Sequence, residues 1–395
     1  TSKNHVYSTL YQSNTFGHYM AMLFSFVLFL IFVIENRFRK FILCLLSLLI
    51  CIGLITSQSR GSFIGVTTAI ILFGIIFKKA LDLKLRDYMI ILVSVTIVFI
   101  FSNSFVEESL ISRYASIMEF GTNHEEDEQI DKIKGFTIRN RVISVSTSNQ
   151  LLHVYFERGI SLYDENFSLL EYRVDDKLGS IEIDNKDYSD FEILIIDNYL
   201  RIGKGSSFLV FANDNNKILF LNPRGEVLRD YTNEYPVYGI ERIGSGRGFI
   251  WSRTIPLLRD RLLIGSGLDS FIYEFPQDDY KGKLKYMYDA YIIIDKPHNL
   301  FLQTAINSGI VSLISYIAIM IIWIYKSIRI ISDNVNSLLI PLVPAIVSYL
   351  IVGMFTDSSV SVTATFWLFM GIGLYYHNRY GEKQRVADSS ISKKT

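Results

Sequence analysis

Two side chains, Arg60 and His298, occupy positions where a membrane-bound site could use them. Arg60 lies in the short polar turn 57–62 between two apolar runs, and its planar guanidinium suits phosphate oxygens. His298 follows Pro297 just before another apolar run. An imidazole titrates near neutrality and can take a proton from a hydroxyl group. A base beside cations that hold an anionic leaving group would support transfer to a hydroxyl acceptor.

Further arginines in the hydrophilic stretch before His298 could hold a diphosphate. They are Arg113, Arg247, Arg253, Arg259 and Arg261. A single arginine at a membrane interface usually extends its charged end to water, and a single histidine at a helix start usually caps or packs. The functional interpretation therefore depends on finding His298 and several arginines in the same region, and not on any one of them. The pair Gly265 and Gly267 lacks the third glycine and the strand–helix context of a dinucleotide loop.

Seven apolar runs must carry these side chains: 20–34, 41–56, 63–77, 88–101, 309–325, 337–355 and 363–376. A membrane-crossing helix needs about 20 mostly apolar residues, so several runs reach that length only with their polar flanks. Buried helices of a large soluble protein are the alternative. With 50% hydrophobic and 20% charged residues, the pattern favours an α-helical polytopic membrane protein with about seven transmembrane helices.

The distribution of Lys and Arg predicts the orientation. Most of the Lys and Arg residues that flank the apolar runs lie in loops 35–40, 78–87 and 326–336 and in the tail 377–395. Loop 356–362 carries none. Because cytoplasmic loops collect Lys and Arg, residues 1–17, 57–62, 106–298 and 356–362 are expected outside the cytoplasmic membrane and the C-terminus inside. Since Thr1 would start outside, we expect this chain to be the C-terminal part of a longer protein.

The hydrophilic block between the fourth and fifth runs changes texture along its length. Short β-rich runs punctuated by Asn, Asp and Gly predict a small antiparallel β domain, a sandwich or a barrel. The expected division is transmembrane helices 1–4 at 1–105, a linker at 106–135, an inserted β domain at 136–243, a motif loop at 244–298, transmembrane helices 5–7 at 299–376 and a cytoplasmic tail at 377–395.

The composition excludes several classes of protein. Lys and Arg number 39 and Asp and Glu 39, so the balance argues against a basic nucleic-acid binder. A mean hydropathy of +0.27 argues against disorder. Two cysteines exclude a disulfide scaffold and a cysteine-rich zinc module. No metal site and no cofactor is expected.

The motifs, taken in order, resemble the O-antigen ligase/polymerase family of bacterial membrane glycosyltransferases. The matching pieces are Asn14, Ser59-Arg60-Gly61, Arg247, Trp251, Pro256, Gly265-Ser266-Gly267, Phe271, Pro297-His298-Asn299, Leu302 and Ser308-Gly309-Ile310. The resemblance covers the chain outside the β domain. That domain departs from the family pattern, because it interrupts the loop between Arg113 and the later motifs.

The resemblance implies a polytopic enzyme that moves a glycan from an undecaprenyl-diphosphate carrier to a hydroxyl of a glycan or lipid acceptor. The reaction would take place at the outer face of the cytoplasmic membrane, without metal or cofactor, in cell-surface polysaccharide assembly. The resemblance carries the catalytic base onto His298. It carries the ligands of the diphosphate onto Arg60, Arg247 and Arg113.

Two other functions stay open. A transporter of lipid-linked glycans would place charged groups near the middle of the bilayer, whereas these runs hold almost no ionisable residues. A membrane-anchored extracytoplasmic glycan-binding receptor would explain the β domain but not Arg60 or His298. Ligase and polymerase cannot be separated from the sequence, because they differ only in the acceptor.

Overall fold

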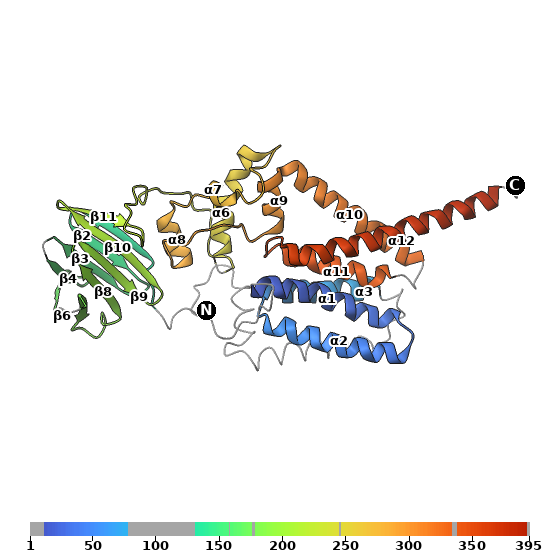
Figure 1. Cartoon of the computed structure of the whole chain (residues 1–395), viewed down its shortest axis with the longest axis horizontal. Helices are drawn as coiled ribbons and strands as arrows, with labels where there is room; N and C mark the ends of the chain where they lie inside the picture. Colours follow the sequence, from blue (N-terminus) through green and yellow to red (C-terminus); the bar gives the residue numbers. More distant parts are fainter. Residues whose placement is uncertain are drawn as a thin grey trace. The chain divides into compact units, whose positions relative to one another are not determined.

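A computed structural model describes residues 12–77 and 131–392, apart from 158, 176–177, 245 and 334–337. The chain divides into two compact units. The helical unit comprises Thr1–Ala115, Leu258–Leu268 and Lys296–Thr395. The β-containing unit comprises Ser116–Leu257 and Asp269–Asp295. Figure 1 labels the helices and strands of both units.

The described part of the helical unit is built from long apolar helices joined by short turns. They are α1 (Ser13–Val33), α2 (Arg37–Thr56), α3 (Arg60–Ile76), the 3₁₀ turn η3 (Leu258–Arg261), α9 (Leu300–Ser308), α10 (Ile310–Asp333), α11 (Leu339–Gly353) and α12 (Val360–Ser392). Asn36 begins α2 with a side-chain cap, since its Oδ1 accepts the N–H of Arg39 at 3.0 Å. Helices are the expected spanning form, because they satisfy their own backbone groups in lipid.

Among the described residues, α1, α2 and α10 are long and apolar enough to cross a membrane, and α3 and α11 are shorter apolar helices. The expected apolar helices and antiparallel β region are thereby confirmed, and they fit a membrane protein. The total of seven spans stays a prediction. The expected run 88–101 lies outside the described residues, and the run 363–376 forms part of α12.

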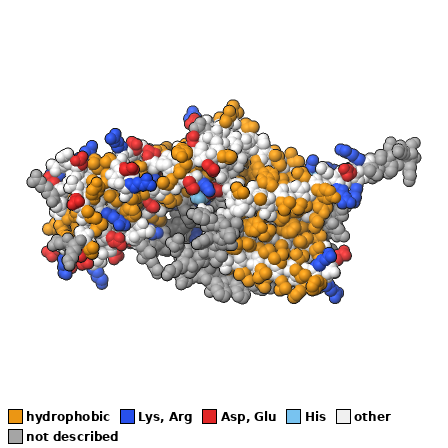
Figure 2. Space-filling view, viewed as in Figure 1, with side chains coloured by type: hydrophobic (Ala, Val, Ile, Leu, Met, Phe, Trp, Pro, Cys, Tyr) orange, Lys and Arg blue, Asp and Glu red, His pale blue; other side chains and the backbone are white. Residues whose placement is uncertain are grey.

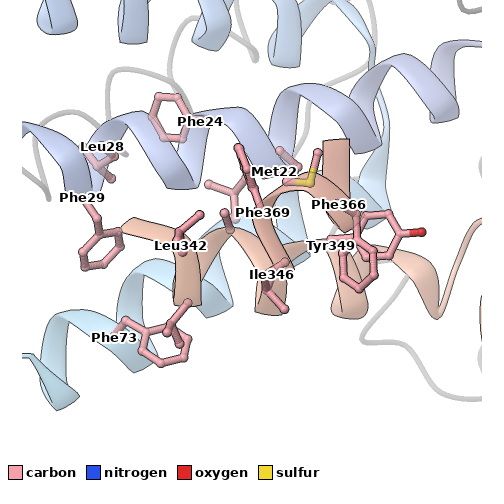
Figure 3. Close-up of a cluster of buried hydrophobic side chains, with 14 of the residues drawn as sticks. Met22, Phe24, Leu28, Phe29, Phe73, Leu342, Ile346, Tyr349, Phe366 and Phe369 are labelled. Atoms are coloured by element: carbon pink, nitrogen blue, oxygen red, sulfur yellow. The ribbon is translucent and has the colours of Figure 1, made fainter. Parts of the chain in front are cut away.

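The core of the helical unit surrounds α11. Leu342, Ile346 and Tyr349 of α11 are at most 1% exposed. Figure 3 shows them among side chains of α1, α3 and α12: Met22, Phe29, Phe73, Phe366 and Phe369. This packing places the two ends of α11 firmly against its neighbours. It therefore fixes the loop that follows α11, which carries Asp357.

Apolar side chains also cover the outside of the helical unit. Leu49 of α2 is 66% exposed, Ile75 of α3 is 68% exposed and Ile314 of α10 is 61% exposed. Figure 2 shows hydrophobic side chains gathered over the helices and charged ones over the strands. A soluble domain rarely exposes so continuous an apolar surface, so this surface fits contact with lipid.

The β-containing unit holds eleven strands in two antiparallel sheets of consecutive strands among its described residues. The first sheet comprises β1 (Gly135–Arg139), β2 (Val142–Ser146), β3 (Leu151–Phe156), β4 (Ile160–Tyr163) and β5 (Leu169–Leu170). The second comprises β6 (Tyr172–Asp175), β7 (Ser180–Ile183), β8 (Phe191–Ile196), β9 (Tyr199–Lys204), β10 (Ser207–Asp214) and β11 (Lys217–Leu221). Within the expected domain 136–243, the strands thus end at Leu221.

The two sheets share one hydrophobic core, as in a sandwich. Alternate residues point inward, so that Ile143 pairs with Val154 in the first sheet and Ile193 pairs with Ile202 in the second, all at most 2% exposed. The Phe136 ring of the first sheet lies 5.7 Å from Phe211 of the second. Three short helices follow the strands: α6 (Arg247–Leu257), α7 (Phe271–Glu274) and α8 (Tyr280–Met287).

Close packing of α3 on α11 predicts a sharp difference between two glycines of α3. A Cβ at Gly65 would lie 2.4 Å from a methyl group of Val352, whereas a Cβ at Gly74 meets no atom of the described residues within 4 Å. We expect Gly65→Ala to destabilise the protein by about 1–3 kcal/mol, through overpacking. Gly74→Ala should be neutral or stabilising by up to about 1 kcal/mol, because alanine favours helix. Thermal unfolding in detergent measures both, and equal unfolding temperatures would contradict the packing.

Candidate functional site

The motif Pro297-His298-Asn299 joins the start of α9 to the end of α11. The Asn299 side chain caps α9, accepting the N–H groups of Phe301 at 2.9 Å and Leu302 at 3.0 Å. The same side chain donates from Nδ2 to the carbonyl oxygen of Met354 at 3.0 Å. Asn299 therefore fixes the position from which the His298 imidazole projects.

His298 forms a hydrogen-bonded pair with Asp357. The Nδ1 atom of His298 lies 2.7 Å from Oδ2 of Asp357. An ionised carboxylate only accepts hydrogen bonds, so the pairing assigns the proton to Nδ1 and leaves a lone pair on Nε2. The histidine side chain is 37% exposed and the aspartate 11%. The pair thus joins a reachable imidazole to a sheltered carboxylate.

Two non-glycine residues of the helical unit, one in each of the two motif segments, adopt the left-handed backbone conformation. His298 has φ +50° and Gln58, in the turn before Arg60, has φ +52°. This conformation is uncommon for residues other than glycine. It costs of order 1–3 kcal/mol and tends to be retained at functional sites. The backbone therefore points independently to the same two segments as the motifs.

The loop after α11 is held on both sides of Asp357. The Thr356 hydroxyl lies 3.0 Å from Nδ1 of His18, and the backbone N–H of Ser358 donates to Oε1 of Gln303 at 2.7 Å. His18 is only 2% exposed, and its Nε2 lies 3.0 Å from the Tyr349 carbonyl oxygen. Asp357 consequently presents its carboxylate from a loop with little freedom.

The turn that carries Arg60 packs against the same loop. A Cβ at Gly61 would lie 3.0 Å from Cβ of Phe355, so the start of α3 lies directly beside the end of α11. On its other side, Gly17 of α1 approaches Ser59 so closely that a Cβ there would lie 2.6 Å from the serine Cβ. Arg60 and the His298–Asp357 pair therefore lie at the same end of the helical unit.

Arg60 is half-buried and is the first residue of α3. The N–H groups of a helix's first turn and the helix dipole favour an anion at this end. A guanidinium there adds a bidentate donor for phosphate or carboxylate oxygens. The turn thus combines two kinds of anion-binding group at one place.

Arg253, grouped above with the possible diphosphate ligands, is instead part of a buried ion cluster. Its Nε lies 2.8 Å from Oδ2 of Asp279 and its Nη1 lies 3.3 Å from Oε1 of Glu241. Its side chain is 4% exposed. Nη1 also donates to the Pro236 carbonyl oxygen at 2.8 Å. These contacts satisfy the guanidinium inside the β-containing unit, so the idea that Arg253 holds a diphosphate is corrected.

The pKa values around this cluster reflect burial and hydrogen bonding. Burial opposes ionisation of Glu241, but backbone N–H groups and the Arg253 charge hold its pKa below the usual value. Burial lowers the pKa of the Lys283 amine to about 8, against the attraction of Asp289 and other nearby carboxylates. The Lys283 ammonium donates to the Ile292 carbonyl oxygen at 2.9 Å. Both groups therefore serve the packing of the unit.

The remaining candidate arginines are placed as follows. Arg247 is the first residue of α6 in the β-containing unit, half-buried, and its Nη1 lies 3.5 Å from the carbonyl oxygen of Gly244. Arg259 is exposed in η3 of the helical unit. Arg113 lies outside the described residues. The structure thus brings Arg60 and His298 to one end of one unit, and the roles of all four candidates stay predictions.

Two partners of the site were missed in the sequence. Asp357 is the one ionisable residue in 356–362, a signal that could have singled it out. His18 stands at the start of the first apolar run, and an ionisable group entering a span is a site candidate. Neither residue has a motif that indicates its partner, because each pairs across a long stretch of sequence.

We expect replacement of Arg253 to act on stability. Arg253→Met leaves the carboxylates of Glu241 and Asp279 buried without their cation, and should destabilise the β-containing unit by about 3–5 kcal/mol. Arg259→Met is the matched control at an exposed position and should change stability by less than about 0.5 kcal/mol. Denaturant unfolding in detergent measures both. Normal stability of Arg253→Met would contradict a structural role for this arginine.

Comparison with known proteins matches residues 238–317 to the family model described as O-antigen ligase. No curated protein and no solved structure matches the chain. The matched segment contains Arg247, the buried Arg253 cluster, the whole of α9 and His298. Over this segment, the chain is similar to the O-antigen ligase family.

Proposed function

We propose that the chain is a membrane glycosyltransferase that moves a glycan from an undecaprenyl-diphosphate carrier to an acceptor hydroxyl, with His298 as the base. The family implies a lipid-linked glycan substrate and a lipid environment. The observation that carries the proposal is the 2.7 Å pair of His298 and Asp357. It lies at the end of the apolar helical unit that also carries Arg60.

The proposed step transfers one proton and one glycosyl group. Nε2 of His298 accepts the proton of the acceptor hydroxyl as its oxygen attacks the anomeric carbon of the donor. The bond between that carbon and the diphosphate oxygen breaks, and polyprenyl diphosphate leaves with the electron pair. The Asp357 carboxylate stabilises the imidazolium that forms. Asp357 keeps one buried oxygen, Oδ1, without a hydrogen-bond partner among the described residues.

The arginines would stabilise the charge of the leaving diphosphate. Of the candidate arginines, Arg60 is the one best suited to this role, because it lies at the N-terminus of α3, where the helix itself favours anions. Arg247 and Arg113 are proposed as further ligands from the family resemblance. Neither the base nor the arginines require a metal in this scheme, and we propose a metal-independent reaction.

The orientation belongs to the same proposal. The positive-inside rule places the Arg60 turn, residues 106–298 and the Asp357 loop outside the cytoplasmic membrane and the C-terminus in the cytoplasm. A carrier with a long apolar tail would lie in the bilayer, with its diphosphate at the level of Arg60. The glycan would then extend outside the cytoplasmic membrane.

Replacing either His298 or Asp357 should lower turnover and leave binding of the carrier intact. His298→Ala should reduce kcat by roughly 10²–10⁴-fold, the usual contribution of a general base. Asp357→Asn should also reduce kcat, because an amide can donate to Nδ1 and move the histidine proton to Nε2. The assay follows release of polyprenyl diphosphate from a lipid-linked oligosaccharide in nanodiscs, with and without EDTA.

Asp295→Asn is the matched control for Asp357→Asn. Asp295 is an exposed carboxylate three residues before His298 in the sequence, and its replacement should leave kcat unchanged. Unchanged turnover in His298→Ala would refute the base assignment. Turnover lost on addition of EDTA would refute metal independence.

Replacing Arg60 should affect both binding and chemistry. Arg60→Lys keeps the charge but loses the bidentate fork, so KM for the donor should rise and kcat should fall, by about tenfold for each 1.4 kcal/mol lost. Arg259→Lys, at an exposed position of the same unit, is the control. An Arg60→Lys enzyme with normal kinetics would remove Arg60 from the site.

A second candidate function, a membrane-anchored glycan receptor, has one observation in its favour. A hollow of about 510 Å³ on the second sheet is lined by β7, β8 and β9 and includes Glu182, Glu192 and Arg201. Carboxylates and a guanidinium can hydrogen-bond sugar hydroxyls. A receptor would tolerate His298→Ala with ligand binding intact, so the turnover assay separates the two functions. Extension of the donor itself would indicate a polymerase, and transfer to another acceptor a ligase.

A further inference from the structure

The segment 262–268, here called the apolar loop, presents large apolar side chains outward. It follows η3 and belongs to the helical unit. Leu263 is 76% exposed, and Ile264 and Leu268 are each 82% exposed. Burial of such side chains is worth about 25 cal/mol per Å² of apolar surface. Three of them exposed together on a short loop therefore call for a partner.

The apolar loop is firmly attached to the corner between α9 and α10. The backbone N–H of Ser266 donates to the Ile306 carbonyl oxygen at 2.8 Å, and that of Gly267 donates to Asn307 at 3.1 Å. In return, the N–H of Ile310 donates to the Leu262 carbonyl oxygen at 3.0 Å. These backbone hydrogen bonds hold the apolar loop in place against α9 and α10, and its apolar side chains project outward.

Two glycines allow this close approach. A Cβ at Gly265 would lie 2.2 Å from the carbonyl carbon of Asn307, and a Cβ at Gly309 would lie 2.4 Å from the Leu263 carbonyl oxygen. Gly309 also has φ +90°, a conformation that suits glycine. Gly265 and Gly309 thus allow the apolar loop to dock on the corner between α9 and α10.

The exposed surface of the apolar loop continues onto α10. Ile310, which is bonded to Leu262, begins α10, and the next outward residues Val311 and Ile314 are 53% and 61% exposed. α10 is long and apolar enough to span the bilayer. Its first turns must therefore enter the hydrocarbon region from the interface, and the apolar loop lies beside that point of entry.

The residues just before the apolar loop differ in character. Arg259 and Asp260 of η3 are exposed and charged. Exposed charged residues next to exposed apolar ones are typical of a segment that lies at the membrane interface. The charges then lie among the headgroups and the apolar side chains among the acyl chains. Charge and continuity with α10 both favour lipid over a protein partner.

We propose that the apolar loop inserts Leu263, Ile264 and Leu268 into the bilayer interface and fixes the depth of α9. The helix α9 has nine residues, about 14 Å in length, with His298 at its start and the apolar loop at its end. Figure 1 shows α9 running across the long axes of α1 and α2. Anchoring one end of α9 at the interface holds the His298 end near the same depth.

Spin labels on the whole protein in nanodiscs test this proposal. Ile264→Cys and Leu268→Cys are each made with Cys44 and Cys51 replaced by alanine, because both native cysteines are free. Leu169→Cys is the matched control: it is a 65% exposed leucine on β5. Collision rates of the nitroxide with oxygen, which concentrates in lipid, and with a water-soluble nickel chelate are then compared.

The proposal predicts that the ratio of oxygen to nickel collisions at positions 264 and 268 is several-fold higher than at 169. Lipids carrying a shallow spin-relaxing headgroup should also broaden the signals at 264 and 268 only. A ratio equal to that at 169 would place the apolar loop in water and overturn the proposal. Low collision rates with both reagents would show that protein covers the loop, and would overturn it equally.

Discussion

The hydrogen bond between His298 and Asp357 depends on the packing of α11 more than on either residue. The two residues are 59 positions apart, and one precedes α9 while the other follows α11. They meet because α11 is buried among α1, α3 and α12, which leaves its end no alternative position. Asn299, Gln303, Thr356 and His18 then lock the loop and the cap together. A rigid scaffold that holds a polar pair at its edge is the arrangement that catalysis requires.

The described helices of the helical unit present apolar side chains both to its core and to its outside. Its core is filled by large side chains such as Phe29, Phe73 and Tyr349, and its outside is covered by leucines and isoleucines. Because lipid is as apolar as the core, close packing has to provide the specificity of helix association. Gly17, Gly61 and Gly65 provide it by letting backbones approach. The polar site is confined to one end, where these approaches bring the turns together.

The β-containing unit consists of two parts, the strands and the short helices that follow them. Its sheets share a core that also takes in Leu284 of α8. The buried Arg253 cluster joins α6, the start of α8 and the loop that carries Glu241. The family match begins at residue 238, after the strands have ended, and runs into α10. The family segment therefore comprises the Arg253 cluster, the apolar loop, α9 and the His298 motif, and the strands lie outside it. The hollow on β7–β9 also lies outside the matched segment.

The sequence by itself determined the apolar helices, the antiparallel strands and the His298 motif. Each of these follows from local physics: hydrophobic runs of about span length, alternating β-rich segments, and a Pro-His-Asn group before a helix. The sequence also grouped Arg253 with the candidate diphosphate ligands, because type and spacing do not reveal that Glu241 and Asp279 surround it. Only the tertiary structure decided which charges are satisfied inside and which residue orients His298. Those pairings join positions far apart in the chain, and such contacts are selected by packing geometry that no local pattern encodes.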